Sequence, residues 1–486
     1  MKLKNILNNV GVKNVFNRKN ISIKSITHIS KDIVKDGMFI CLRGDNFDGN
    51  NYIEEAILKG AVCVVSDDDG IVKMSRVFVH VVFVMVEDIR SSMSLIAKNY
   101  YNRCVDNLEV VGIIGTSGKT TTSIMISQLL SVIDNNIGVI GTNGIFIGNR
   151  RLDNKFTTPD PLELHYIFYQ MKMLGVKRVI MEVSAQAIYY KKLDGIKFKF
   201  CVFTNITPEH LDFFGSIENY ARCKMNFFNK KNMNECVVNI DDFYGMELAY
   251  KLDIPCVSIG LDNPANSFAI DVKSGISGSI FKANILDEVF KIDSPFVGKF
   301  NVYNLISAMT VAKLWGLTKK QMELGLKCLK EIPGRFNVFY KGDNLIVVDF
   351  AHTPDSIDKI LHFISENSNN KIITIIGCVG YSDINKRIDI ASVCDKYSDI
   401  VIITTDNRGD VKFDDIASDM IRGISDKKYF LIEDRFEAIK FGVGKLKDDY
   451  MLVILGKGAE NFQKIGNERI SYSDIVSVKS ILKEGV

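Results

Sequence analysis

Residues 108–130 read LEVVGIIGTSGKTTTSIMISQLL, and this stretch decides the class of fold. An apolar run over 108–114 predicts a buried strand. A glycine-containing turn follows it, and from residue 119 the pattern is that of an amphipathic helix. A buried strand, a glycine turn and a helix in this order are how a phosphate-binding unit of a parallel α/β sheet begins.

The turn itself predicts an ATP site. Glycines allow backbone N–H groups to close around phosphates, and the start of a helix adds partial positive charge. We expect Lys119 to reach the β- and γ-phosphates and the Thr120 hydroxyl to bind Mg²⁺. Ile113 stands where the longer G-x4-G-K-T pattern has its first glycine, so this is the shorter GTxGKT form. The predicted ATP-binding residues of this segment are Gly115, Thr116, Ser117, Gly118, Lys119, Thr120 and Thr121.

Working outward, the chain of 486 residues is too long for one hydrophobic core, because single cores stop growing near roughly 250–300 residues. The phosphate-binding unit marks the start of a second domain. Pro333-Gly334 interrupts a helical pattern and predicts a turn and a hinge before a third domain. We therefore predict three domains, over residues 1–105, 106–331 and 332–486.

Further apolar segments end abruptly in polar or glycine residues, which is typical of strands in a parallel sheet whose carboxyl ends hold ligands. In the second domain these segments are RVIMEVS (178–184), FCVFTN (200–205) and CVVNIDD (236–242). In the third domain they are LIVVD (345–349), KIITIIG (371–377), IVIITTD (400–406) and MLVILG (451–456).

Composition excludes several classes of function. With 61 basic and 58 acidic residues, a net charge of +3 provides no field that would gather nucleic acid or anionic lipid. Ten cysteines are scattered singly, which favours a reducing cytosol over a disulfide scaffold. The longest apolar run, Val77–Val86, is about half the ~20 residues of a membrane span and predicts a buried strand. We expect a cytoplasmic monomer without a signal peptide, membrane insertion or nucleic-acid partner.

Six ordered segments resemble the Mur ligase family. They are GTSGKT (115–120), MEVSAQAI (181–188), TNITPEHLDFFGSIENYARCKMNFF (204–228), GKFNVYN (298–304), PGRF (333–336) and VDFAHTPDS (348–356). The resemblance implies a three-domain α/β fold with a central ATP-binding parallel sheet and a Rossmann-like C-terminal domain. It also implies an ATP-dependent ligase that forms an amide bond through an acyl phosphate. The segments 204–215 and 351–356 are similar to the branch that adds the third peptide residue to UDP-N-acetylmuramoyl-L-alanyl-D-glutamate.

This chemistry passes through concentrated negative charge, so metal ions and cations must line the reacting centre. The resemblance implies catalytic roles for Lys119, Glu182, His210 and Lys224. It implies Mg²⁺ ligation by Thr120, Glu182, His210 and Lys224, with Lys224 converted by CO₂ to a carbamate that supplies an anionic oxygen. Asn301, Arg335 and Asp349 match family residues that hold the nucleotide.

The resemblance also assigns substrate-binding residues. The UDP-linked substrate would contact the first domain and the second through Ser30, Thr157, Thr158, Ser184 and Lys192. Ile29 replaces the aspartate of a family D-S-R segment, and Lys192 replaces an arginine, which removes a bidentate fork.

The third domain would bind the incoming amino acid through Arg387, Asp406, Asn407, Arg408, Gly456 and Glu460. Asp406, Asn407 and Arg408 resemble a D-N-P-R signature for meso-diaminopimelate, whose extra carboxylate suits an arginine. Here the proline is missing, the arginine stands one place early and Ala459 replaces a histidine. We favour meso-diaminopimelate, with L-lysine or another diamino acid next.

Two alternatives stay open on the sequence. Ile29, Gln186, Val379, Tyr381 and the altered DNR segment are compatible with a divergent amide synthetase of the same family that acts on another carboxylate, such as a folate-polyglutamate enzyme. The other alternative is a regulatory or scaffold protein that binds a nucleotide without turning it over. The presence of Thr120, Glu182, His210 and Lys224 argues against it.

Overall fold

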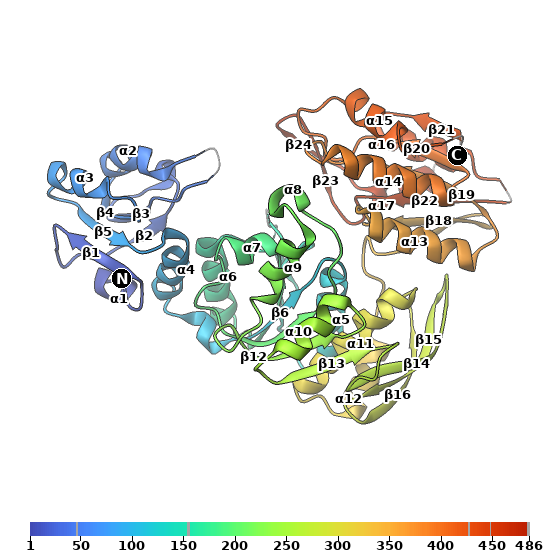
Figure 1. The fold of residues 1–486 in the computed structure, drawn as a ribbon, viewed down its shortest axis with the longest axis horizontal. Helices are drawn as coiled ribbons and strands as arrows, with labels where there is room; N and C mark the ends of the chain where they lie inside the picture. The colour runs from blue at the N-terminus through green and yellow to red at the C-terminus, as the bar shows by residue number, and fades with distance from the viewer. Residues whose placement is uncertain (45–46, 153–155, 426–427, 448, 484–486) are drawn as a thin grey trace.

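The computed structural model describes residues 1–44, 47–152, 156–425, 428–447 and 449–483. Three β-sheets follow one another along the chain, and the first and third lie on different sides of the central one (Figure 1). Among the helices in these residues, none is long and apolar enough to cross a membrane. The predicted three-domain α/β fold is confirmed.

The first sheet has five strands in the order β1-β5-β4-β3-β2, parallel except for β1. Its strands are β1 (Val12–Phe16), β2 (Ser25–Thr27), β3 (Gly37–Ile40), β4 (Ala61–Ser66) and β5 (Val82–Val86). Its helices are α1 (Leu3–Ile6), α2 (Ile53–Leu58), α3 (Ile71–Val77) and α4 (Ile89–Tyr100), with the 3-10 turns η1 (Ser30–Asp32), η2 (Gly49–Tyr52) and η3 (Cys104–Asn107).

The prediction of one buried strand over Val77–Val86 is wrong in its first half. Helix α3 ends at Val77, and only Val82–Val86 form β5. Val77 and Val79 are 69% and 62% exposed, so they cover no core. A run of apolar residues does not by itself separate a strand from a helix end and a turn, and the chain needs a turn here to enter β5 parallel to β4.

The central sheet has eleven strands in the order β16-β15-β14-β13-β12-β11-β6-β10-β7-β8-β9. Strands from β14 through β7 in this order run parallel, and antiparallel hairpins extend both edges. The strands are β6 (Glu109–Ile114), β7 (Gly138–Gly141), β8 (Gly144–Ile147), β9 (Arg150–Leu152), β10 (Arg178–Val183), β11 (Phe198–Phe203), β12 (Met233–Asn239), β13 (Cys256–Gly260), β14 (Ser267–Gly275), β15 (Gly278–Ile285) and β16 (Glu288–Ser294).

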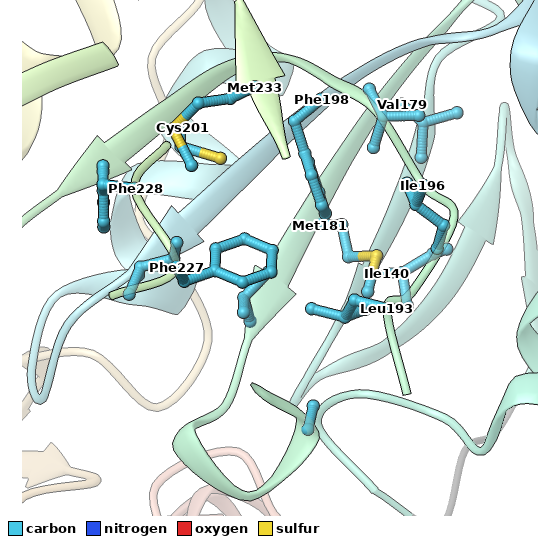
Figure 2. Packing of buried hydrophobic residues seen from close by; sticks show 14 of the residues in the cluster. Ile140, Val179, Met181, Leu193, Ile196, Phe198, Cys201, Phe227, Phe228 and Met233 are labelled. Atoms are coloured by element: carbon cyan, nitrogen blue, oxygen red, sulfur yellow. The ribbon is translucent and has the colours of Figure 1, made fainter. Parts of the chain in front are cut away.

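Helices cover both faces of this sheet and create two cores. They are α5 (Lys119–Leu130), α6 (Pro161–Met173), α7 (Ala185–Tyr189), α8 (Leu211–Phe214), α9 (Ile217–Met225), α10 (Phe243–Lys251), α11 (Lys299–Leu314) and α12 (Lys319–Lys327). Figure 2 shows part of the core on one face, which contains Met181 of β10 and Phe198 and Cys201 of β11. The opposite core contains residues of α5, α11 and α12. Alternating strand residues supply the two faces, which is why these segments are apolar throughout.

Helix α5 differs from the predicted amphipathic helix. It lies between the sheet and α11, and its residues from Thr120 to Ser123 are buried together with its apolar positions. The helix therefore exposes little polar surface, because α11 covers the side that would otherwise face water. The small hydroxyl side chains of its first turns allow α11 to approach closely.

The third sheet has six strands in the order β17-β18-β22-β19-β20-β21, parallel except for β17. Its strands are β17 (Asn337–Lys341), β18 (Asn344–Asp349), β19 (Lys371–Ile376), β20 (Ile400–Ile403), β21 (Lys428–Leu431) and β22 (Tyr450–Leu455), and β23 (Phe462–Ile465) and β24 (Glu468–Ser471) form a separate hairpin. The helices are α13 (Pro354–Asn367), α14 (Ile384–Tyr397), α15 (Phe413–Ile421), α16 (Arg435–Gly444) and α17 (Asp474–Lys483).

Pro333-Gly334 lies between α12 and β17, outside any helix or strand. Gly334 has a left-handed backbone (φ 72°), and a Cβ there would overlap the backbone of Gly458 and Ala459. Its carbonyl accepts a hydrogen bond of 3.0 Å from the Phe350 amide. The turn is thus packed against two loops of the third sheet, and only glycine fits there.

Candidate active site

The loop Gly115–Gly118 joins the carboxyl end of β6 to α5 and is held by the segment that follows β11. The Thr116 amide donates to the Asn205 carbonyl (2.8 Å), and the Ser117 amide donates to Asn205 Oδ1 (2.9 Å). Gly118 has φ 85°, and a side chain there would overlap the Asn304 amide. The Lys119 ammonium donates to the carbonyls of Gly115 (3.0 Å) and Thr116 (2.6 Å). A glycine loop, the start of α5 and a lysine therefore lie together, as an anion site requires.

Glu182 lies beside this loop, near the end of the neighbouring strand β10. Its side chain is buried, with the residue 1% exposed. The carboxylate accepts hydrogen bonds from the Thr120 hydroxyl (2.9 Å) and from the hydroxyl and amide of Thr142 (both 3.0 Å). No ion pair to Glu182 occurs within the described residues. A buried carboxylate held only by neutral donors, with a hydroxyl alongside, is an oxygen donor set suited to a hard cation.

Lys224 forms a second polar group on the other side of the loop. It lies on α9, is 1% exposed, and donates a hydrogen bond to the hydroxyl of Tyr220 one turn earlier. That hydroxyl also lies 3.2 Å from Thr116 Oγ1. Burial, with the nearby charge of Lys119, holds the pKa of Lys224 well below its ordinary value. Lys224 is therefore in a setting that disfavours its charged form and is tied to the phosphate loop.

Glu209 connects this group to the third sheet. Tyr220 donates to Glu209 Oε2 (3.3 Å), and Glu209 lies 3.9 Å from the His210 ring and 3.6 Å from His352 Nε2, which follows β18. Burial alone would raise the pKa of Glu209, but the hydrogen bond with His352 and the charge of Lys119 leave it below its ordinary value. His210 has a left-handed backbone (φ 55°), and burial lowers the pKa of its ring against the opposing charge of Glu209.

The described residues contain no cluster of three or more His, Cys, Asp or Glu side chains placed to hold a metal ion. A cation here would need oxygen atoms from other groups as well, and Thr120 offers one beside Glu182. The structure thus brings Thr120 and Glu182 together and brings His210 and Lys224 into a second group with Glu209. Thr116 and Lys119 lie between the two groups.

The residues predicted to hold the nucleotide come from α11 and the start of the third sheet. Asn301 accepts a hydrogen bond from the Asn304 amide (3.0 Å), and Asn304 in turn accepts one from Thr122 (3.2 Å) next to the phosphate loop. Asp349, at the end of β18, accepts hydrogen bonds from the amides of Phe336 and Ala351, each of 2.7 Å.

Arg335 lies just before β17, the first strand of the third sheet. Its guanidinium stacks over the Phe350 ring at 4.5 Å, and burial lowers its pKa against the opposing charge of Asp349. Burial raises the pKa of Asp349, with Arg335 opposing the rise. The nearby charge of Glu182 also acts on Arg335, so the arginine connects the third sheet to the central cluster.

Three of the five residues predicted for the UDP-linked substrate gather around β10. Thr157 Oγ1 lies 3.1 Å from Thr142 Oγ1, and the Thr158 hydroxyl donates to the Glu182 carbonyl (2.9 Å). Ser184 caps α7 and donates its amide to Thr158 (3.0 Å).

The other two lie where the first and central sheets meet. Lys192 forms an ion pair of 2.6 Å with Asp160. The charges of Asp160 and Lys192 both act on His28, whose pKa is lowered chiefly by burial. Ser30, two residues later, donates to Glu55 (2.7 Å). The side-chain hydrogen bond of Ser30 is therefore made to helix α2, which packs beside the first sheet.

A compact charged group lies at the ends of β20 and β22. The fully buried Lys457 bonds Asp406 (3.1 Å), Asn407 Oδ1 (3.2 Å) and Glu460 (2.8 Å), and the Asn407 amide reaches Glu460 (3.0 Å). Burial alone would raise the pKa of Asp406, but Lys457 and Arg435 lower it. Gly456, with φ 110°, lies against the Asp406 carboxylate. Asp406, Asn407, Gly456 and Glu460 are thus brought together.

The two predicted arginines of the third sheet have other partners. Arg387 forms an ion pair of 2.7 Å with Asp419 and donates to the Gly380 carbonyl. Arg408 donates to the Val411 carbonyl (3.0 Å) and lies 3.7 Å from Glu433. At the position where the resembling signature has its arginine, this chain has Gly409 with φ 56°.

Several residues of the site were not found by sequence reasoning. They are Thr142, Asn205, Glu209, Tyr220, Asn304 and Lys457. Four of them, Asn205, Glu209, Tyr220 and Asn304, lie in the segments 204–228 and 298–304 that resemble the family. Their polar side chains close to predicted site residues could have indicated a role. Thr142 follows a short strand and carried no signal.

Comparisons with known proteins agree with this architecture. Three family models match in order: the Mur ligase family catalytic domain (residues 22–109), the Mur ligase middle domain (113–312) and the Mur ligase glutamate ligase domain (334–458). A UDP-N-acetylmuramoyl-L-alanyl-D-glutamate–2,6-diaminopimelate ligase of Clostridioides difficile is 33% identical over 98% of both chains. One from Caldanaerobacter subterraneus is 35% identical over 98% of both. A solved structure of such a ligase has a TM-score of 0.67 at 27% identity, covering 95% of each chain.

Proposed function

The chain belongs to the Mur ligase family, and from this we propose that it is the ATP-dependent ligase that joins a diamino acid to the D-glutamate carboxylate of UDP-N-acetylmuramoyl-L-alanyl-D-glutamate. The product is the tripeptide precursor of peptidoglycan, with ADP and phosphate released. The predicted family, its ligase class and its fold are confirmed by these comparisons.

One observation carries the proposal. The buried Glu182 carboxylate accepts a hydrogen bond from Thr120, which follows the Gly115–Gly118 loop, and the Lys224–Tyr220 pair reaches Thr116 inside that loop. A phosphate loop flanked by two polar groups suits a reaction in which phosphate and carboxylate must meet. A protein that only binds nucleotide has no need for the second group.

Each group of residues would then have its own role in the reaction. Lys119 and the loop amides bind the β- and γ-phosphates, and Asn301, Arg335 and Asp349 hold the rest of the nucleotide. The substrate carboxylate attacks the γ-phosphorus, ADP leaves, and the amine of the incoming amino acid then displaces phosphate from the acyl phosphate. Lys119 and His210 would face the negative charge that forms, and contacts from the central and third sheets to one ATP would close the site and exclude water.

Mg²⁺ would be held by Thr120 and Glu182, and a second Mg²⁺ by His210 and Lys224, and these ions would neutralise charge on the transferred phosphoryl group. The Glu182 carboxylate with the Thr120 hydroxyl beside it offers oxygen atoms that fit such an ion. We propose that Lys224 is carbamylated, which would turn an amine whose charged form is disfavoured by burial into an anionic oxygen ligand. Its burial beside Tyr220 supports this assignment.

The three sheets would divide substrate recognition. We assign the UDP-linked substrate to residues 1–105 with Ser30, and to Thr157, Thr158, Ser184 and Lys192 of the central region 106–331. The amino acid is assigned to residues 332–486 through Arg387, Asp406, Asn407, Arg408, Gly456 and Glu460. We propose meso-diaminopimelate as that amino acid, because the similar ligases of C. difficile and C. subterraneus carry 2,6-diaminopimelate in their names. A cytoplasmic monomer remains our proposal for its state and place.

The test is direct. Purified protein is incubated with ATP, Mg²⁺ and UDP-N-acetylmuramoyl-L-alanyl-D-glutamate, single amino acids are added, and phosphate release and product mass are both read. We expect product with meso-diaminopimelate and little with L-lysine. Product with L-lysine alone would correct the amino acid. Absence of product with every amino acid, from protein that still binds ATP, would overturn the proposed substrate and favour another carboxylate.

A further inference from the structure

Three cysteines stand in one row across the central sheet. Cys201 of β11 is the register partner of Cys236 in β12, and Cys236 is the register partner of Cys256 in β13. On the other side of Cys201 the row ends at Gly112 of β6, which has no side chain. We call Cys201, Cys236 and Cys256 the cysteine row.

The thiols of the row lie on the same face of the sheet. Register partners in neighbouring parallel strands point to the same side, about 4.8 Å apart along the hydrogen-bonding direction. Cys201 and Cys236 belong to the core that Figure 2 shows in part, and Cys256 packs against it. A separation near 4.8 Å falls within the roughly 4.4–6.8 Å between Cα atoms that a disulfide spans.

Only one end of the row is partly exposed. Cys201 and Cys236 are fully buried, whereas Cys256 is half-buried at the start of its strand. The Cys236 thiol donates a hydrogen bond of 3.6 Å to the Pro255 carbonyl, and its interaction with the neighbouring Cys256 thiol raises the pKa of Cys236 and lowers that of Cys256. Burial raises the pKa of Cys201. Cys256 is thus the member that combines access with thiolate character, and Cys236 is a neighbour that can resolve it.

We propose that Cys236 and Cys256 form a redox pair that closes reversibly to a disulfide on exposure to a hydroperoxide. This inference is independent of the proposed ligase function. The Cys256 thiolate attacks the peroxide oxygen, which leaves a sulfenic acid and releases hydroxide. The Cys236 sulfur then attacks the Cys256 sulfur, the S–OH bond breaks, and the Cys236 proton leaves with that hydroxyl as water. Two thiols and one hydrogen peroxide become one disulfide and two waters.

The sheet need not be rebuilt for this bond. β12 and β13 are already paired from Cys236↔Cys256 to Asn239↔Ile259. Beyond the far end of the pair, Asp241 accepts hydrogen bonds from the amides of Leu261, Asp262 and Asn263. The disulfide would therefore cross-link two strands that are fixed in register at both ends.

The experiment uses the full-length folded protein. It is treated with hydrogen peroxide, its free thiols are alkylated after denaturation without reductant, and peptides are mapped by mass spectrometry. We expect the free thiols to fall from ten to eight, with a 236–256 linked peptide that dithiothreitol releases. Cys256→Ser should abolish the linked peptide. Cys104→Ser and Cys328→Ser, which remove other half-buried cysteines, should leave it unchanged.

Three results would overturn the proposal. One is ten free thiols after peroxide. Another is sulfinic or sulfonic acid at Cys256 without a linked peptide. The third is a link that joins Cys201 to Cys236 or joins two molecules. Because the wild-type peptide map decides among these by itself, the outcome does not depend on whether a variant folds.

Discussion

The cluster around Glu182 and the cluster around Lys457 are both buried carboxylate groups, but their charges are balanced in opposite ways. Glu182 is bound by the hydroxyls of Thr120 and Thr142 and by one amide, all of them neutral. Asp406 and Glu460 share the ammonium of Lys457. A carboxylate with no cation bonded to it is prepared to take one from outside, whereas two carboxylates that already share a lysine are prepared to orient a ligand. From this comparison we expect the phosphoryl-transfer chemistry at Glu182 and the recognition of the amino acid at Lys457.

The largest effect should come from Glu182→Gln. Removing the only charged oxygen donor of the first cluster should lower kcat by about 10²–10⁴-fold, because charge stabilisation of phosphoryl transfer is lost. The measurement is phosphate release with saturating substrates. Glu288→Gln, which breaks an ion pair with Lys313 at the edge of the same sheet, is the matched control and should stay near wild type. Equal losses in both variants would contradict the comparison.

Lys457→Met should act on the second cluster through binding. Asp406 and Glu460 would lose their shared cation, so we expect KM for the amino acid to rise by roughly 10–100-fold while KM for ATP changes little. Breaking a buried ion pair should also cost about 3–5 kcal/mol of the free energy of unfolding. Initial-rate kinetics and urea unfolding measure the two effects. Lys464→Met, which alters an exposed lysine of β23, serves as the control. A fall in kcat alone would place Lys457 with the chemistry.

Arg408→Ala should sharpen the assignment of the amino acid. The side chain donates to the Val411 carbonyl, but its ion pair with the exposed Glu433 is loose, so its charge remains available to a ligand carboxylate. We expect KM for meso-diaminopimelate to rise about 10-fold, as for a lost charged hydrogen bond. Rates with L-lysine, which lacks that carboxylate, should not change. An unchanged KM for meso-diaminopimelate would remove Arg408 from the binding site.

The smallest effect should be the pH dependence that Glu209 confers. Its pKa is held below the ordinary value in the folded chain by His352 and Lys119 against burial, so its stabilisation is present above the unfolded pKa of about 4.3 and is lost as pH falls through the folded pKa. Glu209→Gln should therefore reduce the free energy of unfolding by about 1–3 kcal/mol at pH 7. The gap between variant and wild type should narrow in acid. Urea unfolding between pH 7 and pH 3 checks this, and a gap that widens in acid would reverse the sign assigned to Glu209.

Parts of the site could be found from the sequence because they are local. The strand, loop and helix of residues 108–130 occur where the pattern predicts them, with β6 ending at Ile114 and α5 beginning at Lys119. Local patterning also misled, since Val77–Val86 contains a helix end, an exposed turn and a strand. Neighbouring residues determine backbone conformation, but burial depends on what the rest of the chain places against a segment.

The partners of each side chain could not be found in this way. Thr142 meets Glu182 because β7 and β6 both pair with β10, and Tyr220 meets Thr116 although 104 residues separate them. Lys457 reaches Asp406 because β22 and β20 both pair with β19. Each of these contacts depends on the order of strands in a sheet.

The sequence by itself determined the family, the phosphate loop and the polar residues that end the parallel strands, because these are properties of short segments. Only the tertiary structure decided that Glu182 has neutral hydrogen-bond partners, that Asp406 and Glu460 share Lys457, and that Arg387 and Arg408 have protein partners. It also aligned three separately spaced cysteines in one row. The physical reason is that charge balance and register are set by distances between segments that the sheets bring together.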